Sequence, residues 1–156
     1  MDANVIWSQG MSFAGQAETG FEVPLGADPA VGGANDGFRP LELMAVSLAG
    51  CTAMDVISIL RKKQVDVSAF KVKVHADQAE TFPKVFTQMV ITYLITGHNV
   101  DEVAVLRAIE LSATKYCPAQ AMLGKVAPMQ LTYQIFEDEG GGKAGLVKQG
   151  TFQPQV

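Results

Sequence analysis

The sequence lacks the features that mark several common protein classes. Its formal net charge is −4 and its longest basic run is Arg61–Lys63, so nucleic acid is not an expected partner. The most apolar stretch, 41–60, carries Glu42 and Asp55, which a membrane-spanning helix tolerates poorly, so we expect no membrane partner. No basic region precedes an apolar run after Met1, which predicts no secretory signal and a cytoplasmic location.

Cysteine and histidine are scarce, and their spacing argues against the usual metal sites. The chain has two cysteines, Cys51 and Cys117, and two histidines, His75 and His98. None stands in a C-x-x-C or other metal-ligand spacing, so we expect no metal and no other cofactor. Two cysteines in a cytoplasmic chain are not expected to form a permanent structural disulfide. They are therefore the first candidates for chemistry.

The length and composition fit one globular domain with a loosely attached end. A chain of 156 residues, 48% of them hydrophobic, is long enough to bury a sizeable core. We predict one domain over residues 1–137. The segment 138–156 contains Gly140–Gly142 and is predicted to be a mobile or weakly docked tail.

Residue patterns predict an α+β fold. A helix that begins at Pro40 and runs to about Lys63 is apolar on almost all sides, so it must be covered by a wrapped antiparallel sheet or across a dimer. A second helix is expected at about 100–115, and short helical turns follow Pro118. Short apolar runs and period-two alternation predict strands, three within 4–25 and one each at 70–76, 89–95 and 129–135. The order β-β-β-α-β-β-α-α-β favours α+β over a doubly wound sheet.

Each cysteine admits a structural and a chemical interpretation. Cys51 lies mid-helix among small residues that leave space beside its sulfur. It could be a small buried hydrophobic residue, whereas a reactive thiolate needs a cation or hydrogen-bond donors nearby. Cys117 precedes Pro118 at the expected N-terminus of a short helix, where unpaired N–H groups stabilise a thiolate, but it could equally fill an N-cap position without chemistry.

Together the two cysteines suit the reduction of a peroxide. One sulfur attacks an O–O bond and becomes a sulfenic acid, and the second condenses with it to a disulfide. Their separation along the sequence leaves open whether the two sulfurs meet.

Two motifs resemble the OsmC/Ohr family. Residues 39–43 followed by 49–51 resemble that family's cysteine helix, and residues 115–118 resemble its second cysteine motif. The order of elements is also similar to about residue 136. The resemblance implies an intertwined homodimer with long central helices enclosed by sheets from both subunits. It further implies reduction of organic hydroperoxides or hydrogen peroxide at the expense of a dithiol reductant, with Cys51 as the peroxidatic cysteine and Cys117 as the resolving one.

The resemblance also implies an arginine and a glutamate that hold and activate the attacking thiolate. The position that matches the family's glutamate is Leu41, and the carboxylate of this chain is Glu42, one place later. At about 100° per residue, Glu42 points about 180° away from Cys51 around a regular helix. Arg39 is the sole arginine before the helix. Arg39 and Glu42 are therefore the candidates, and the chain is more similar to the divergent OsmC-like branch.

Two other functions fit parts of the pattern. A non-catalytic OsmC-like dimer could bind an apolar ligand, with methionines lining its pocket and the cysteines serving only in packing. A hot-dog-type thioesterase also wraps a sheet around a long helix, but it has no place for the second helix with Cys117 and Pro118. Loss of both thiols on mixing the reduced protein with a peroxide separates the peroxidase from both.

Overall fold

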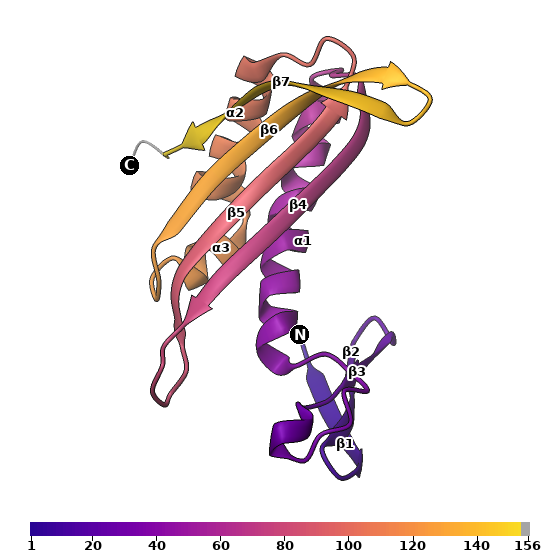
Figure 1. Ribbon diagram of the computed structural model, residues 1–156, viewed down its shortest axis with the longest axis vertical. Coiled ribbons are helices and arrows are strands. Elements are labelled where there is room, and N and C mark those ends of the chain that lie inside the picture. Colours follow the sequence, from indigo (N-terminus) through magenta and orange to yellow (C-terminus); the bar gives the residue numbers. More distant parts are fainter. Residues whose placement is uncertain (154–156) are drawn as a thin grey trace. The chain divides into compact units, whose positions relative to one another are not determined.

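The computed structural model describes residues 1–153 and contains two sheets and one long helix (Figure 1). The expected α+β fold is confirmed. The chain divides into two compact units, Met1–Met44 and the remainder from Ala45, where the length alone suggested one domain. The strands of each unit pair only with one another, which is the physical reason for the division.

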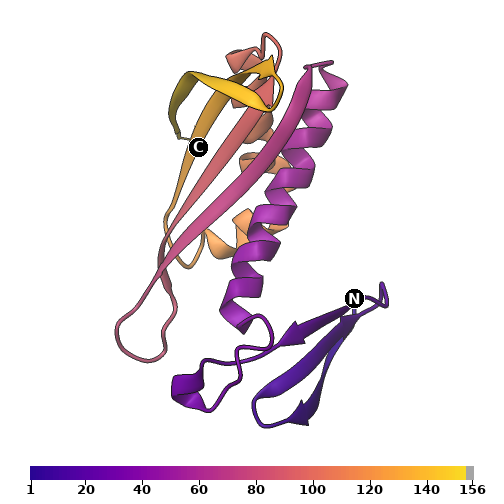
Figure 2. The same ribbon diagram turned by 45° about the vertical axis from the view of Figure 1, so that its right-hand side comes forward.

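The first unit is built on a three-stranded antiparallel sheet (Figure 2). Its elements are β1 (Ala3–Gln9), β2 (Ser12–Ala17), β3 (Glu22–Leu25) and the short 3-10 helix η1 (Pro29–Val31). Gly10 and Gly20 take positive φ angles of 52° and 78° in the turns between the strands, a conformation that side chains with a Cβ rarely adopt. The three strands predicted within residues 4–25 are therefore confirmed.

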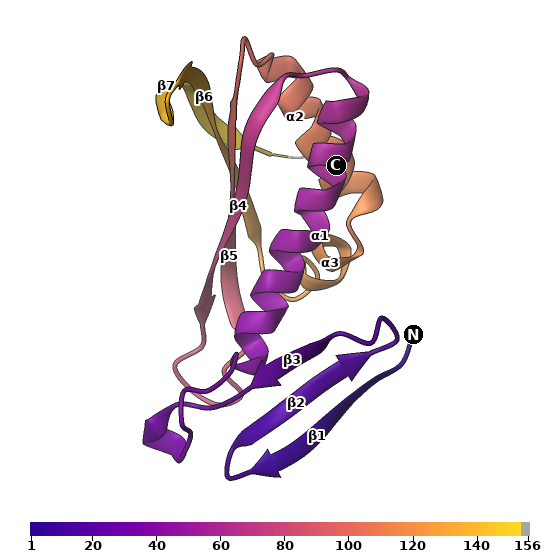
Figure 3. The same ribbon diagram turned by 90° about the vertical axis from the view of Figure 1, so that its right-hand side faces the viewer.

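The second unit is built on a four-stranded sheet with α1, α2 and α3 on one face (Figure 3). The strands, in the order in which they pair, are β4 (Val67–Gln78), β5 (Phe86–Gly97), β6 (Met129–Gly140) and β7 (Lys143–Phe152). The pair β5–β6 is parallel, and the other two pairs are antiparallel. This parallel pair corrects the expected antiparallel sheet. It arises because the helical segment between β5 and β6 carries the chain back across one face of the sheet.

The core of the second unit lies between this sheet and the helices. Alternate residues of β5 are at most 1% exposed, namely Met89, Ile91, Tyr93 and Ile95. From β6, Leu131 and Ile135 join them at 2% and 1% exposure. The period-two pattern correctly predicted which side of each strand is buried, because successive side chains of a strand point to opposite faces.

The long helix α1 (Pro40–Lys62) buries one stripe of side chains within the chain. Its buried residues are Leu48, Thr52, Val56 and Leu60, which are spaced four apart and so share one face. Met54 is 73% exposed and Val46 is 53% exposed. By length and composition alone, α1 could cross a membrane. Within the described chain α1 is therefore not covered on all sides, and the expected second chain stays a prediction.

The helical segment between β5 and β6 has three parts. These are α2 (Glu102–Leu111), the π-helical turn η2 (Ser112–Tyr116) and α3 (Pro118–Leu123). Asp101 caps α2 by accepting hydrogen bonds from the N–H groups of Val103 and Ala104 at 3.1 and 3.3 Å. The predicted helix at about 100–115 therefore corresponds to α2 together with η2.

The segment after residue 137 is not the mobile tail that was predicted. β6 continues to Gly140, and β7 pairs back onto it over most of its length. Lys148 Nζ lies 2.8 Å from Glu102 Oε2, and Tyr133 OH donates to Glu102 Oε1 at 2.7 Å, which ties β7 to α2. The glycine run, with positive φ angles, makes the hairpin turn. Of the predicted tail, residues 154–156 lie outside the described part of the chain.

Candidate active site

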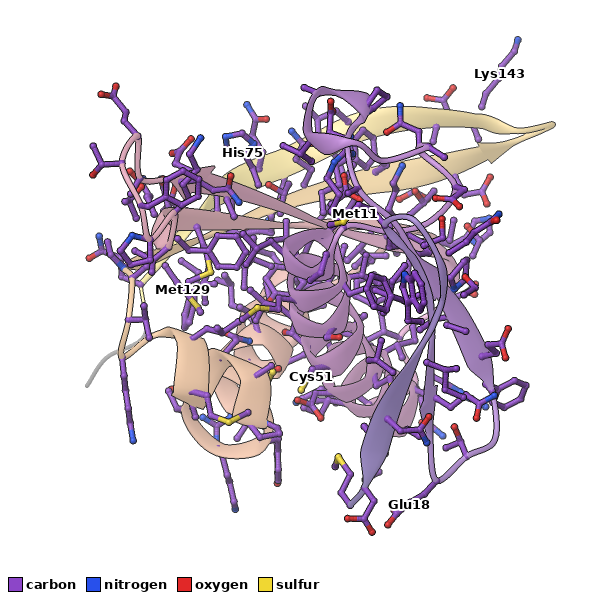
Figure 4. All side chains as sticks on the ribbon, turned by 90° about the horizontal axis from the view of Figure 1, so that it is seen from below. Met11, Glu18, Cys51, His75, Met129 and Lys143 are labelled. Atoms are coloured by element: carbon purple, nitrogen blue, oxygen red, sulfur yellow. The ribbon has the colours of Figure 1, made fainter. Side chains whose placement is uncertain are left out.

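Cys51 and Cys117 lie side by side. The Sγ of Cys117 donates a hydrogen bond to the Sγ of Cys51 at 2.9 Å, and both thiols are free. Cys51 is half-buried, whereas Cys117 is 3% exposed. Figure 4 shows Cys51 on the side of α1 that faces the α2–α3 segment. The question that the sequence left open, whether the two sulfurs meet, is answered by this contact.

The backbone around Cys117 holds its sulfur in place. The N–H of Cys117 donates to the carbonyl of Ser112 at 2.9 Å, which closes the π-helical turn. Pro118 then starts α3, where a proline needs no N–H donor. Cys117 is the N-cap of α3, and its Sγ accepts a hydrogen bond from the N–H of Gln120 at 3.4 Å. The predicted place at a helix start is confirmed.

Cys117 holds its proton at neutral pH. Burial and the hydrogen bond with Cys51 raise the pKa of the Cys117 thiol to about 12, and the N–H groups of Gln120 and Ala119 oppose them only in part. Of the two interpretations of Cys117, the N-cap is the one that the structure shows, and desolvation outweighs the few N–H donors of the short helix. Cys117 is the donor of the pair, and Cys51 is the more exposed sulfur.

A buried chain of hydrogen bonds lies next to the cysteine pair. We call it the hydroxyl network, and it consists of Thr52, Asp55, Tyr93, Ser112 and Gln120. Thr52 Oγ1 lies 2.7 Å from Tyr93 OH and 2.9 Å from Ser112 Oγ. Gln120 Nε2 donates to Thr52 Oγ1 at 3.0 Å, and Ser112 Oγ donates to Asp55 Oδ2 at 3.0 Å. Burial is the main cause that raises the pKa of Tyr93 to about 12, so its hydroxyl stays protonated.

Sequence reasoning missed most of this network. A signal for one member exists in α1, where Thr52 interrupts an otherwise aliphatic stripe of residues spaced four apart. A threonine in such a stripe needs a hydrogen-bond partner inside the core. No comparable signal marks Ser112 or Gln120, because only the packing of η2 and α3 on α1 buries them.

Arg39 and Glu42 bind each other at the start of α1. Arg39 Nη1 lies 3.2 Å from Glu42 Oε1, and Arg39 Nη2 donates to Asp28 Oδ2 at 2.8 Å and to Asn35 Oδ1 at 3.0 Å. Glu42 Oε2 accepts from the backbone N–H of Arg39 at 3.0 Å, which is one half of a capping box. This N–H is the main cause that lowers the pKa of Glu42. Both residues thus have a structural role in the first unit, and their role toward Cys51 stays a prediction.

The described residues offer no metal-binding cluster. Within residues 1–153, no three His, Cys, Asp or Glu side chains are grouped to hold a metal ion. His75 is 76% exposed beside Asp77, and His98 is 51% exposed beside Asp66.

The chain is similar to proteins of one family. Residues 33–132 match the family described as OsmC-like protein. The chain is 33% identical over 138 residues to Protein YhfA of Escherichia coli strain K12, which covers 86% of this chain and 98% of YhfA.

Solved structures show the same fold. The crystal structure of an OsmC-like protein from Mycoplasma pneumoniae superposes with a TM-score of 0.74 at 16% identity, covering 86% of this chain and 95% of that one. That of an organic hydroperoxide resistance protein OsmC from Legionella pneumophila gives 0.62 at 13% identity, covering 85% and 94%. At these identities the two structures support the fold alone. The match over residues 33–132 shows that the chain belongs to the OsmC-like protein family.

Proposed function

We propose that this protein is a thiol peroxidase that reduces organic hydroperoxides or hydrogen peroxide, with Cys51 as the attacking and Cys117 as the resolving cysteine. The observation that carries the proposal is the 2.9 Å contact between the two sulfurs, in which the buried Cys117 keeps its proton and donates a hydrogen bond to the more exposed Cys51. Membership of the OsmC family and the likeness to a hydroperoxide resistance protein point to the same class of reaction.

In the first step, the thiolate of Cys51 attacks one oxygen of the peroxide. An S–O bond forms, the O–O bond breaks, and the leaving alkoxide or hydroxide takes a proton from solvent to become an alcohol or water. Cys51 is oxidised by two electrons to a sulfenic acid, and the peroxide is reduced. The thiolate is the nucleophile, and the half-buried Cys51 is the more exposed of the two sulfurs.

In the second step, the sulfur of Cys117 attacks the sulfur of the Cys51 sulfenic acid. An S–S bond forms and the S–O bond breaks, and the proton of Cys117 leaves with the hydroxyl group as water. Burial raises the pKa of the Cys117 thiol, so its proton must be removed as the S–S bond forms, because the thiolate is the nucleophile. A dithiol reductant then supplies two electrons by thiol–disulfide exchange and restores both thiols.

Arg39 and Glu42 are the candidates for stabilising the Cys51 thiolate. A cation within about 4–6 Å of a thiolate favours the charged form. In the first unit the guanidinium of Arg39 is oriented by Asp28, Asn35 and Glu42. Variants of Arg39 test this role.

We further propose a soluble, cytoplasmic homodimer. The exposed apolar residues of α1, among them Val46 and Met54, would then be covered by a second chain. A large apolar patch on a soluble protein commonly marks an interface. The charged Asp55, bound to Ser112 in the second unit, fits a soluble helix better than one in lipid.

Mixing reduced protein with one equivalent of cumene hydroperoxide or hydrogen peroxide tests the proposed activity. We expect both thiols to disappear within seconds to minutes, with one peroxide consumed per pair of thiols, and dithiothreitol to restore them. Protein whose thiols have been alkylated serves as the control. Survival of both thiols over many minutes with either peroxide would rule the activity out.

A second candidate function is the binding of an apolar ligand. The first unit contains a hollow of about 440 Å³, and its lining is almost entirely apolar, including Val5, Met11, Phe13, Leu25 and Leu43. Apolar hollows of this size hold small molecules in many proteins. Native mass spectrometry of the purified protein, with and without an added fatty acid, tests it, and the absence of any bound mass would reject it.

A further inference from the structure

In the described part of the chain, buried polar side chains gather in one place. Thr52 and Ser112 are fully buried and Gln120 is 6% exposed, and the described residues contain no other buried hydroxyl (tyrosine aside), amide or charged side chain. All three belong to the hydroxyl network, and each comes from a different element, α1, η2 or α3. Burying such groups is costly unless each finds a partner, and apolar side chains could fill the same space. Their position beside the cysteine pair therefore suggests a role there.

The hydrogen bonds of the network run in one direction. The carboxylate of Asp55 can only accept a hydrogen bond, so the hydroxyl of Ser112 must be its donor. Thr52 then donates to Ser112, and Tyr93 donates to Thr52. The amide of Gln120 donates to Thr52 Oγ1 at 3.0 Å and reaches Ser112 Oγ at 3.5 Å. Thr52 and Ser112 thus each have a donor and an acceptor partner, and a network satisfied in this way is rigid.

Two members of the network also hold Cys117 directly. The carbonyl of Ser112 accepts from the N–H of Cys117 at 2.9 Å, and the N–H of Gln120 donates to Cys117 Sγ at 3.4 Å. The side chains of the same two residues bind Thr52, which follows Cys51 in α1. The residues that fix Cys117 are therefore the ones that attach its segment to the helix carrying Cys51.

We propose that Thr52, Ser112 and Gln120 are positioning residues that hold the sulfur of Cys117 against Cys51. They thereby set the rate at which the disulfide forms and its stability once formed. The kinetic part rests on the proposed function, because it concerns the attack of Cys117 on the sulfenic acid of Cys51. Fast attack matters because a sulfenic acid that waits is oxidised by a second peroxide to a sulfinic acid.

A matched pair of variants separates the hydroxyl group from the packing of Thr52. Thr52→Val keeps the shape and removes the hydroxyl, whereas Thr52→Ser keeps the hydroxyl and removes a methyl group. Gln120→Met removes the amide at similar length. Because a shift of about 1 Å between reacting groups can cost about a hundredfold in rate, we expect disulfide formation to slow at least about tenfold in Thr52→Val and Gln120→Met. Thr52→Ser should stay within about twofold of the wild type.

The measurement resolves the two steps in time. Stopped-flow mixing with a slight excess of peroxide, quenched with dimedone or iodoacetamide and read by mass spectrometry, gives sulfenic acid, disulfide and sulfinic acid. We expect the rate of sulfenic acid formation to change by less than about twofold, while sulfinic acid accumulates in Thr52→Val and Gln120→Met. Equal losses in Thr52→Ser and Thr52→Val would overturn the proposal, because the hydroxyl would then not be the cause.

A second measurement needs no peroxide. Equilibration of each variant with dithiothreitol or glutathione buffers gives the reduction potential of the Cys51–Cys117 disulfide. We expect the equilibrium constant for disulfide formation to fall about tenfold in Thr52→Val and Gln120→Met, or about 30 mV for this two-electron couple, with Thr52→Ser unchanged. If the wild type ignores peroxide but these potentials shift, the peroxidase proposal fails and the positioning role stands. If folded Thr52→Val and Gln120→Met match the wild type in both measurements, the positioning role is wrong.

Discussion

The sulfur of Cys117 donates the hydrogen bond that joins it to the sulfur of Cys51, across 2.9 Å and 66 positions of sequence. The buried member of the pair is thus the protonated one, and the more exposed member receives the donor. In the proposed reaction, Cys51 therefore makes the first attack on the peroxide and Cys117 carries out the second step.

Serine substitutions at the two cysteines test that assignment. Cys51→Ser should abolish peroxide consumption, because the accessible nucleophile is gone. Cys117→Ser should consume one equivalent of peroxide and stop, with a sulfenic acid on Cys51 that dimedone labels. Labelling is followed by intact-protein mass spectrometry. The reaction is run without reductant, because dithiothreitol could reduce the Cys51 sulfenic acid in place of Cys117 and allow further turnovers. A dimedone adduct on Cys117 in Cys51→Ser would reverse the roles.

Alkaline pH should destabilise the fold through Cys117 and Tyr93. Burial raises the pKa of Cys117 from 9.0 and that of Tyr93 from 10.0 to about 12 in each case. Each group therefore contributes stability that is complete below its unfolded pKa and is lost as pH rises through its folded value. Urea midpoints of the wild type should fall as pH rises from 9 towards 12. The fall should be shallower in Cys117→Ser and in Tyr93→Phe, and parallel pH profiles for all three proteins would contradict it.

A charge on the exposed face of α1 should break the proposed dimer. Met54 is 73% exposed within the chain, so Met54→Lys should leave the fold of a single chain intact. It should separate the subunits, because an unpaired charge is costly to bury at an apolar interface. Val147 on β7 is 56% exposed and lies outside residues 33–132, so Val147→Lys is the matched control. Light scattering after size-exclusion chromatography gives the masses. A wild-type protein of 16.6 kDa in solution would exclude the dimer.

Arg39→Ala tests the expected activation of Cys51. If the guanidinium stabilises the thiolate, loss of its charge should leave a smaller fraction of the Cys51 sulfur ionised. Sulfenic acid formation should then slow about tenfold or more. Arg61→Ala, at the exposed end of α1, is the control. An unchanged rate with reduced thermal stability would limit Arg39 to its contacts with Asp28, Asn35 and Glu42.

Lys148→Met should weaken the attachment of β7 in a pH-dependent way. Lys148 is the first cause, and Tyr133 the second, that lower the pKa of Glu102. Because the pKa of Glu102 is lower in the folded than in the unfolded chain, this carboxylate stabilises the fold above its unfolded pKa of about 4.5. That stability is lost as the pH falls through the folded pKa. The wild type should therefore exceed Lys148→Met in stability at pH 7, and the two should converge below about pH 4. A constant difference across this range would mean that the ion pair is not responsible.

Much of the fold could be predicted from local patterns. Alternation along residues 89–95 and 129–135 correctly identified buried strand faces, and Pro40 marked the start of α1. The glycine run at 140–142 predicted a mobile or weakly docked tail, but it makes a hairpin turn. Three glycines suit either structure, and only the pairing of β7 with β6 distinguishes the turn from the tail. The parallel pairing of β5 with β6 was equally outside the reach of a local pattern.

The sequence by itself determined that the two candidate cysteines stand in motifs of one family, because residue type and flanking residues are local properties. Only the tertiary structure decided that Cys51 and Cys117 touch, which of them keeps its proton, and that Thr52, Ser112 and Gln120 stand beside them. Contact, burial and hydrogen-bond direction depend on how η2 and α3 pack against α1. That packing brings together residues 66 positions apart, and no local sequence pattern predicts it.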